Sequence, residues 1–225
     1  MFFAMAVLVV ATAGVGTAQQ ESIEETRAKA EAGDAIAQAS LGYAYANGRT
    51  VAKDDTKAAR WYRLAAEQGY TAAQVNLGVM YTNGRGVPQD YAAAAGLYRL
   101  AAEQGNPMAR YLLGNCYRQG RGVRQDDAEA LRWFRLAAEQ GLPKAMFNLG
   151  LMSGLGAGTS EDDVQAYMWF NLAASRLTGT YRDSTEPTRE TIIETRDFVY
   201  DSLTPDQRAE GQRLAREWDE AHPRD

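Results

Sequence analysis

The sequence predicts an all-α fold, a solenoid of paired antiparallel helices with a helical cap at its C-terminal end. Two dipeptides that recur every 36 residues predict it. They are Leu-Gly, at Leu41-Gly42, Leu77-Gly78, Leu113-Gly114 and Leu149-Gly150, and Ala-Ala, at Ala65-Ala66, Ala101-Ala102, Ala137-Ala138 and Ala173-Ala174. A period of this length indicates stacked supersecondary units, because one unit cannot bury its apolar face alone. No segment of any length alternates with period two, so strands are not expected.

Before the repeats, the first twenty residues carry no charge and contain an apolar run from Phe2 to about Ala13. Small residues lead to Gly16-Thr17-Ala18, and signal peptidase requires small residues three and one before the cut. We expect residues 1–18 to be a signal peptide and the protein to be exported, as a periplasmic or secreted bacterial protein. An uncleaved membrane anchor is the alternative, although about 17 uncharged residues fall short of the ~20 that a spanning helix needs. A core helix is disfavoured because the run has no polar face.

Residues 19–34 are expected to form an N-terminal capping helix that closes at Gly33. Four repeats follow over residues 35–178, with bounds 35–70, 71–106, 107–142 and 143–178. Each consists of two helices, at about 35–47 and 55–68 in the first repeat. Residues 179–225 are expected to hold two capping helices: one spans Thr188 to Ser202, and the other opens at Thr204-Pro205 and runs to about Trp218. Their charged composition suits the outer face of a solenoid end.

Helix boundaries are marked by residues with capping chemistry. Gly105 is expected to adopt a left-handed conformation at a helix C-terminus, and Asn106 to cap the next helix before Pro107 in its first turn. Aspartates occupy the N-cap position of helices in most rows of the repeat: Asp34 before a first helix, and Asp54, Asp90, Asp126 and Asp162 before second helices.

Two columns of the repeat predict the packing within it. Glycine recurs inside the first helix, at Gly42, Gly78, Gly114 and Gly150, where it costs up to ~1 kcal/mol. Its repetition predicts a close helix–helix approach where a methyl group would not fit. Bulky residues recur in the second helix as Trp61-Tyr62, Leu97-Tyr98, Trp133-Phe134 and Trp169-Phe170. We expect this aromatic stripe to belong to the core.

The combined pattern A-x3-LG-x2-Y-x2-G-x-GV-x2-D-x3-A-x2-WY-x2-AA-x2-G resembles the Sel1-like repeat family, relatives of tetratricopeptide repeats. The second and third repeats match it at nearly every position, and the resemblance covers about two thirds of the chain. It implies a right-handed α-solenoid that serves as a scaffold or adaptor for a protein or peptide partner. Some exported members staple each repeat with a disulfide, which the single cysteine of this chain excludes.

The fourth repeat departs from the pattern. Ser153 replaces the tyrosine of the first helix, and Ser175-Arg176-Leu177 replaces Glu-Gln-Gly, so its second helix is expected to run past its usual end. The loop 154–160 is rich in glycine, but a phosphate-binding loop would follow a strand and carry a lysine. A degenerate repeat loop is the better interpretation.

Composition argues against several classes of function. A net charge of −5 and a pI of about 5.1 argue against nucleic acid as the main partner. One cysteine excludes a multi-cysteine zinc site, and the one histidine lies close to the C-terminus at His222. Acidic clusters such as Asp126-Asp127 lie at helix N-termini, where carboxylates stabilise the helix dipole. We therefore expect no enzymatic activity, no cofactor and no metal.

Cys116 and two columns of arginine are the remaining candidates for a reactive or ligand-binding role. Cys116 shares its column with Ala44, Met80 and Met152, so a buried apolar thiol is expected. The arginine columns are Arg49, Arg85 and Arg121 in the loops, and Arg63, Arg99 and Arg135 in the second helices. They either bind helix-end carbonyls and neighbouring carboxylates or form a ladder for an anionic partner.

A binding groove is predicted on the face of the first helices opposite the Ala-Leu-Tyr stripe. At 100° per residue its columns cluster on one side of the helix, and first helices line the concave surface of paired-helix solenoids. The predicted partner-binding residues are Val75, Asn76, Val79, Tyr111, Leu112, Asn115, Phe147, Asn148 and Leu151. The alternative is that Tyr111 and Phe147 pack against the adjoining repeat.

Two functional classes stay open at this stage. The first is a protein-interaction scaffold in the bacterial envelope. The second is a cell-wall or glycan-associated factor that supports an enzyme encoded elsewhere. After signal cleavage, no stable membrane span is expected in either case.

The N-terminal segment gives the first test. If residues 1–18 are removed on export, mass spectrometry of the mature protein should find an N-terminus near Gln19. Full-length protein that retains Met1 in a soluble cytoplasmic fraction would contradict export.

Overall fold

A computed structural model describes residues 23–48, 50–177 and 188–223 of the chain. The regular structure of these residues is entirely helical, and no strand occurs among them, as predicted. The chain divides into two compact units, residues 1–101 and 102–225.

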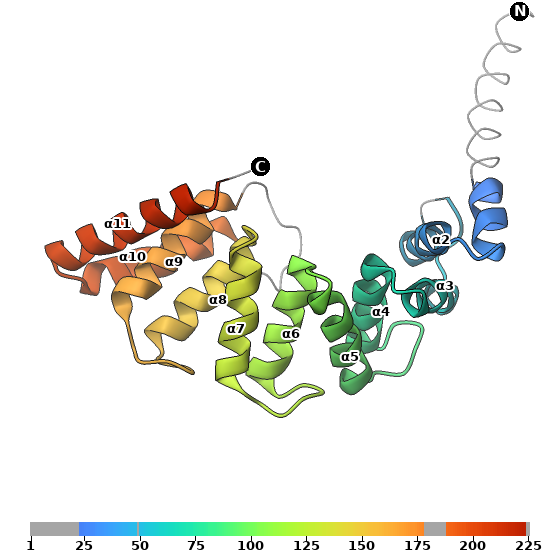
Figure 1. Cartoon of the computed structure of the whole chain (residues 1–225), viewed down its shortest axis with the longest axis horizontal. Helices are drawn as coiled ribbons and strands as arrows, with labels where there is room; N and C mark the ends of the chain where they lie inside the picture. The colour runs from blue at the N-terminus through green and yellow to red at the C-terminus, as the bar shows by residue number, and fades with distance from the viewer. Residues whose placement is uncertain (1–22, 49, 178–187, 224–225) are drawn as a thin grey trace, which may run out of the picture. The chain divides into compact units, whose positions relative to one another are not determined.

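The first unit contains a helix over residues 23–31, then α2 (Ala35–Asn47), α3 (Asp55–Glu67), α4 (Thr71–Asn83) and most of α5 (Tyr91–Glu103) (Figure 1). Helix α3 packs against both α2 and α4. Ala30 of the 23–31 helix is buried with Ala37 and Leu41 of α2. The expected second helix of the first repeat ends one residue early, because Gln68 is its C-cap.

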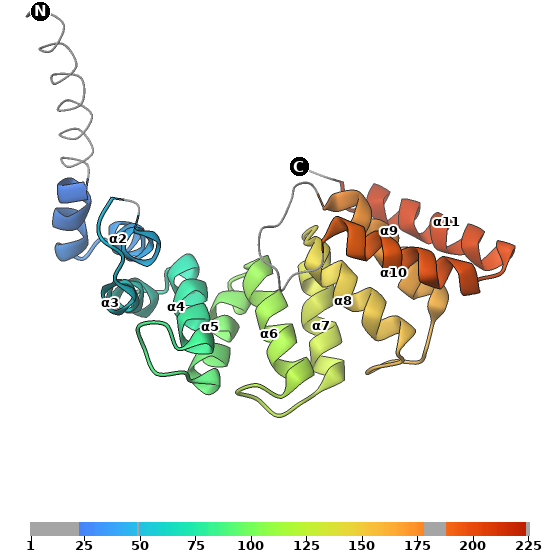
Figure 2. The same cartoon turned by 180° about the vertical axis from the view of Figure 1, so that it is seen from behind.

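The second unit contains α6 (Pro107–Gln119), α7 (Asp127–Ala138), α8 (Pro143–Gly154), α9 (Asp163–Arg176), α10 (Arg189–Ser202) and α11 (Pro205–Ala221). Helix α7 packs between α6 and α8, and α8 packs on α9. Helices α10 and α11 both lie against α9 (Figures 1 and 2). Helix α11 ends three residues beyond the expected Trp218. Helix α9 ends at Arg176, one residue past the position equivalent to Glu103, so the predicted extension is short.

The predicted N-caps hold the helix starts. The side chains of Asp34, Asp54, Asp126 and Asp162 each accept a hydrogen bond from the backbone amide three residues further on, at 2.7–3.0 Å. Asp90 accepts from the amides of Ala92 and Ala93, both at 2.9 Å. Each such cap contributes about 0.5–2 kcal/mol. The repeat therefore fixes where its helices begin by the same chemistry in successive rows.

The glycine column lies directly on the aromatic column of the same repeat. Tyr62, Tyr98, Phe134 and Phe170 are all buried. A methyl group built on the facing glycine would lie only 2.5–2.8 Å from the nearest ring carbon in the four pairs Gly42–Tyr62, Gly78–Tyr98, Gly114–Phe134 and Gly150–Phe170. The close approach predicted from the sequence is confirmed, and its partner is the ring of the second helix.

This contact gives a stability prediction. In Gly78→Ala the new methyl group would lie 2.5 Å from Tyr98 Cε1, so ring or helix must move. We expect a loss of about 1–3 kcal/mol, the usual cost of overpacking, seen as a lower melting temperature by circular dichroism. Gly96→Ala in α5 is the matched control, because nothing lies within 4 Å of its added methyl group. The control should gain up to ~1 kcal/mol from helix propensity. Equal melting temperatures in the two variants would contradict the packing model.

Candidate functional site

In the first unit, the predicted groove residues lie on α4. Val75, Asn76 and Val79 are half-buried, whereas Leu77 and Met80 of the same helix are buried in the core. The Asn76 side-chain amide makes no hydrogen bond to another residue of the described ranges. This face of α4 therefore offers apolar surface and an unpaired amide together.

In the second unit, four of the predicted residues keep an accessible surface. Leu112 and Asn115 on α6 and Phe147 and Leu151 on α8 are half-buried. The Asn115 amide, like that of Asn76, is not hydrogen-bonded within the part of the chain that the structure describes. Both helices pack on α7. The second unit thus repeats the combination found on α4.

Tyr111 and Asn148 are buried, and the ring of half-buried Phe147 packs against the core. Tyr111 is only 8% exposed, and its ring centroid lies 5.9 Å from that of Phe134. The Phe147 ring is 5.5 Å from Phe170. Asn148 is buried and donates from Nδ2 to the Lys144 carbonyl at 3.2 Å. Both rings therefore lie against the ring of the second helix of their own repeat.

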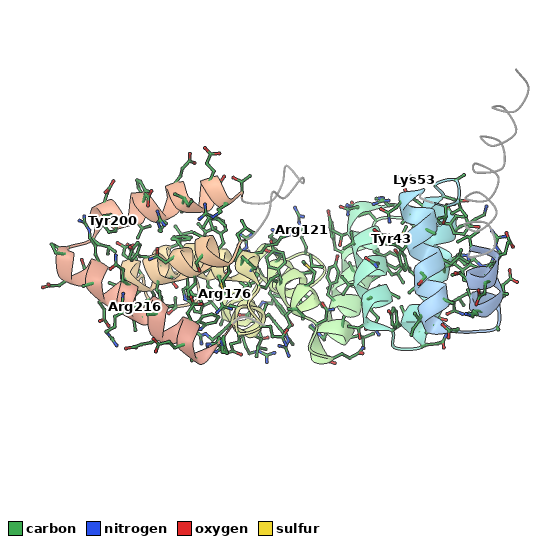
Figure 3. The ribbon with its side chains drawn as sticks, turned by 90° about the horizontal axis from the view of Figure 1, so that it is seen from above. Tyr43, Lys53, Arg121, Arg176, Tyr200 and Arg216 are labelled. Carbon is green, nitrogen blue, oxygen red and sulfur yellow. The ribbon has the colours of Figure 1, made fainter. Side chains whose placement is uncertain are left out.

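The loop arginine column binds neighbouring groups where the structure shows its partners. The Arg85 guanidinium donates to Asp55 Oδ1 at 2.7 Å and to the Ala46 carbonyl at 3.4 Å. Its hydrogen bond holds the pKa of the Asp55 carboxyl below its usual range. Arg121 is exposed in the loop after α6 (Figure 3). Arg49 lies outside the described residues. For Arg85, the interpretation as a structural ion pair is confirmed.

A pocket of about 820 Å³ lies in the second unit, on the side of the second helices. Helices α7 and α9, the 158–162 loop and α11 form its walls, and α8 contributes Leu149 and Ser153. None of the nine predicted residues lines it. The signal in the sequence was the loss of the repeat tyrosine at Ser153, which leaves this space open.

The C-terminal wall of the pocket is an aromatic cluster. Trp169 of α9 meets Trp218 of α11 edge to face at 5.7 Å, and His222 stacks on Trp218 at 4.1 Å. The buried Arg176 side chain pairs with Asp219 at 2.6 Å and lies 4.8 Å from the Trp218 ring centroid (Figure 3). Breaking a buried pair of this kind is costly, so the pair fixes α11 against α9.

The glycine-rich loop and Cys116 both lie in closely packed places of the repeat. The 154–160 loop follows a helix, and a methyl group added at Gly158 would lie 2.8 Å from the Asp127 backbone. Gly86 meets Asp55 in the same way, so the degenerate-loop interpretation is confirmed. Across residues 23–48, 50–177 and 188–223, no three His, Cys, Asp or Glu side chains are placed to hold a metal. Cys116 is buried, and desolvation raises its pKa to about 11.

Comparison with protein families identifies the repeats. The Sel1 repeat model matches residues 35–70, 71–106, 107–142 and 143–176, which are more than half of the chain. The chain belongs to the Sel1 repeat family. Its last match ends two residues before the bound expected from the sequence.

Two solved Sel1 repeat structures resemble the chain. One is c5321, a protective antigen present in uropathogenic Escherichia coli strains and displaying an SLR fold. It is 47% identical, with a TM-score of 0.67, over 69% of this chain and 33% of that chain. The other is a Sel1 repeat protein from Oxalobacter formigenes, 36% identical with a TM-score of 0.61, over 64% of this chain and 57% of that chain. The match therefore spans a third to just over half of these relatives. A comparison with curated proteins finds no match.

Sel1 repeat proteins are generally scaffolds for protein interaction, and the fold is typically non-enzymatic. The described helices include none that is both long and apolar enough to cross a membrane.

Cys116 provides a test of the core of this Sel1 repeat unit. A thiol with a pKa of about 11 is almost entirely protonated at pH 8, and only the thiolate reacts readily. We expect Ellman's reagent to leave Cys116 unmodified in the native protein at pH 8 and to modify it fully in guanidinium chloride. Rapid reaction of the folded protein would show that α6 opens or that the thiol is accessible.

Proposed function

We propose that the chain is a non-enzymatic scaffold that binds a partner protein segment on the first helices of its repeats. The observation that carries the proposal concerns two amides, Asn76 on α4 and Asn115 on α6, which make no hydrogen bond to any residue that the structure describes and lie beside half-buried apolar side chains. An asparagine amide offers both a donor and an acceptor, which matches the backbone of an extended peptide. Neighbouring apolar groups gain free energy when a partner covers them.

The contact residues differ between the two units. Val75, Asn76 and Val79 form the patch of the first unit. In the second unit, Leu112, Asn115 and Leu151 face the partner, whereas Tyr111, Phe147 and Asn148 support them from the core side. Each patch binds through its own helices, so either unit can engage a segment.

We place this scaffold in the bacterial envelope. The uncharged apolar N-terminal run supports export, although residues 1–22 lie outside the described residues. The similar Escherichia coli protein is described as a protective antigen, which supports a location outside the cytoplasm. An uncleaved membrane anchor is the alternative to a periplasmic or secreted form.

Photo-crosslinking tests the location and the patches together. p-Benzoylphenylalanine placed at Val79 or Leu112 in cells should give discrete protein adducts, identified by mass spectrometry. The same probe at Arg60, which is exposed on the second helix α3, is the matched control and should give none. Adducts of equal yield at all three positions would contradict a binding role for the first helices. Co-sedimentation with peptidoglycan and no protein adduct would instead favour the cell-wall alternative.

A partner identified in this way allows a quantitative test. Asn115→Ala should weaken its binding roughly tenfold, since losing one hydrogen bond at an interface costs about 1–2 kcal/mol. The melting temperature should not fall, because the amide makes no hydrogen bond within the described chain and alanine is the better helix former. Unchanged affinity would contradict the role of this amide.

A further inference from the structure

The pocket of the second unit has a counterpart in the first unit that is filled by side chains. Tyr81, Val87 and Leu97 pack there against one apolar cluster. The Tyr81 phenol also receives a hydrogen bond from Arg63 Nη2, at 3.0 Å. A ring with a hydroxyl group therefore occupies this place, and an arginine holds the hydroxyl.

Two repeats later, the equivalent positions carry a different set of residues. Ser153 takes the place of Tyr81 and Thr159 that of Val87, so a phenol and an isopropyl group are replaced by smaller side chains with hydroxyl groups. Trp169 takes the place of Leu97 and provides a larger aromatic wall. All three line the pocket of about 820 Å³. The missing phenol thus explains both the space and its polar lining, and the volume is that of a typical ligand site.

The pocket keeps an arginine at the position equivalent to Arg63 of the first unit. Arg135 is equivalent to Arg63 and lines the pocket. Within the described ranges its guanidinium makes no hydrogen bond or ion pair. The donors that hold the phenol in the first unit are therefore present here without an acceptor.

The charges around the pocket are balanced. Arg132 and Arg135 contribute two positive charges to the lining, Glu139 and Asp162 contribute two negative ones, and Arg132 is also paired with Glu129 at 3.2 Å. Balanced charges favour a neutral hydroxyl group over a phosphate or carboxylate as the acceptor for Arg135. Trp169, which is 8% exposed, and Trp218, which stacks on His222, line the pocket, and their aromatic edges favour a flat ring beside them.

We propose that this pocket binds the side chain of a tyrosine residue in a partner protein. Its ring lies against Trp169 and Trp218, in the space that Ser153 leaves open, and its hydroxyl oxygen accepts from Arg135. The site lies on the second helices and does not depend on the first-helix patches, so either proposal can fail alone.

Nuclear magnetic resonance titration of the full chain with small probes tests the proposal. N-acetyltyrosinamide should shift the indole N–H signals of Trp169 and Trp218, assigned through Trp169→Phe and Trp218→Phe. N-acetylphenylalaninamide lacks the hydroxyl group and should bind about tenfold more weakly, as expected for a lost hydrogen bond to a charged donor. Equal binding of the two probes would overturn the proposal. Tighter binding of N-acetylphosphotyrosinamide would also overturn it in favour of an anionic ligand.

Three variants distinguish binding of the probe in the pocket from changes in folding and from binding elsewhere on the chain. Arg135→Gln should reduce the preference for the tyrosine probe to about one, with an unchanged circular dichroism spectrum, because the side chain is exposed. Arg63→Gln is the matched control in the first unit and should leave the preference at about tenfold. Ser153→Tyr should fill the pocket with the chain's own phenol and abolish the indole shifts. Unchanged probe binding in both Arg135→Gln and a folded Ser153→Tyr would show that the probe binds elsewhere.

Discussion

The contact on which the rest of the structure depends is that between a glycine backbone and an aromatic ring within each repeat. Gly42, Gly78, Gly114 and Gly150 have no side chain. The first helix of each repeat can therefore lie directly against the aromatic ring of its second helix. The ring is large enough to hold the helix pair together, and it loses little entropy because it has only two side-chain torsions. Cys116 is the single cysteine, so no disulfide within the chain can stabilise the helix pairs, and this packing must hold them together.

The same contact governs which positions are available for function. In the second unit, Tyr111 and Phe147 add their own rings to Phe134 and Phe170, so that the core extends into the column where the first unit has Val75. The accessible surface of α6 is then formed by smaller side chains such as Leu112 and Asn115.

Features that occur in every row could be predicted from the sequence. The period, the helix pairs, the aspartate caps and the glycine approach each appear several times, so that chance agreement was excluded. The inward direction of Tyr111 could not be predicted, because a position at the edge of the packing face can turn either way on a helix. Its direction depends on the space beside Phe134, which only the folded helix pair defines. The burial of Asn148, which donates to the Lys144 carbonyl, likewise depends on the folded helix pair.

The pocket could not be predicted because it depends on a side chain that is missing. Ser153 stands out in the sequence as a departure from the repeat. Its consequence could not be predicted, because the hydrogen bond between Arg63 and Tyr81 joins two helices and is visible only in the fold. The end of the solenoid then completes the site: the pair of Arg176 with Asp219 fixes α11 on α9, and Trp218 closes the wall. The regular columns thus build the core, whereas the departures from them, where the last repeat meets its cap, create a cavity with unmatched donors. In a repeat protein, a broken column beside an intact one is therefore a physical indication of where a ligand can bind, because the intact column shows which group the break has removed.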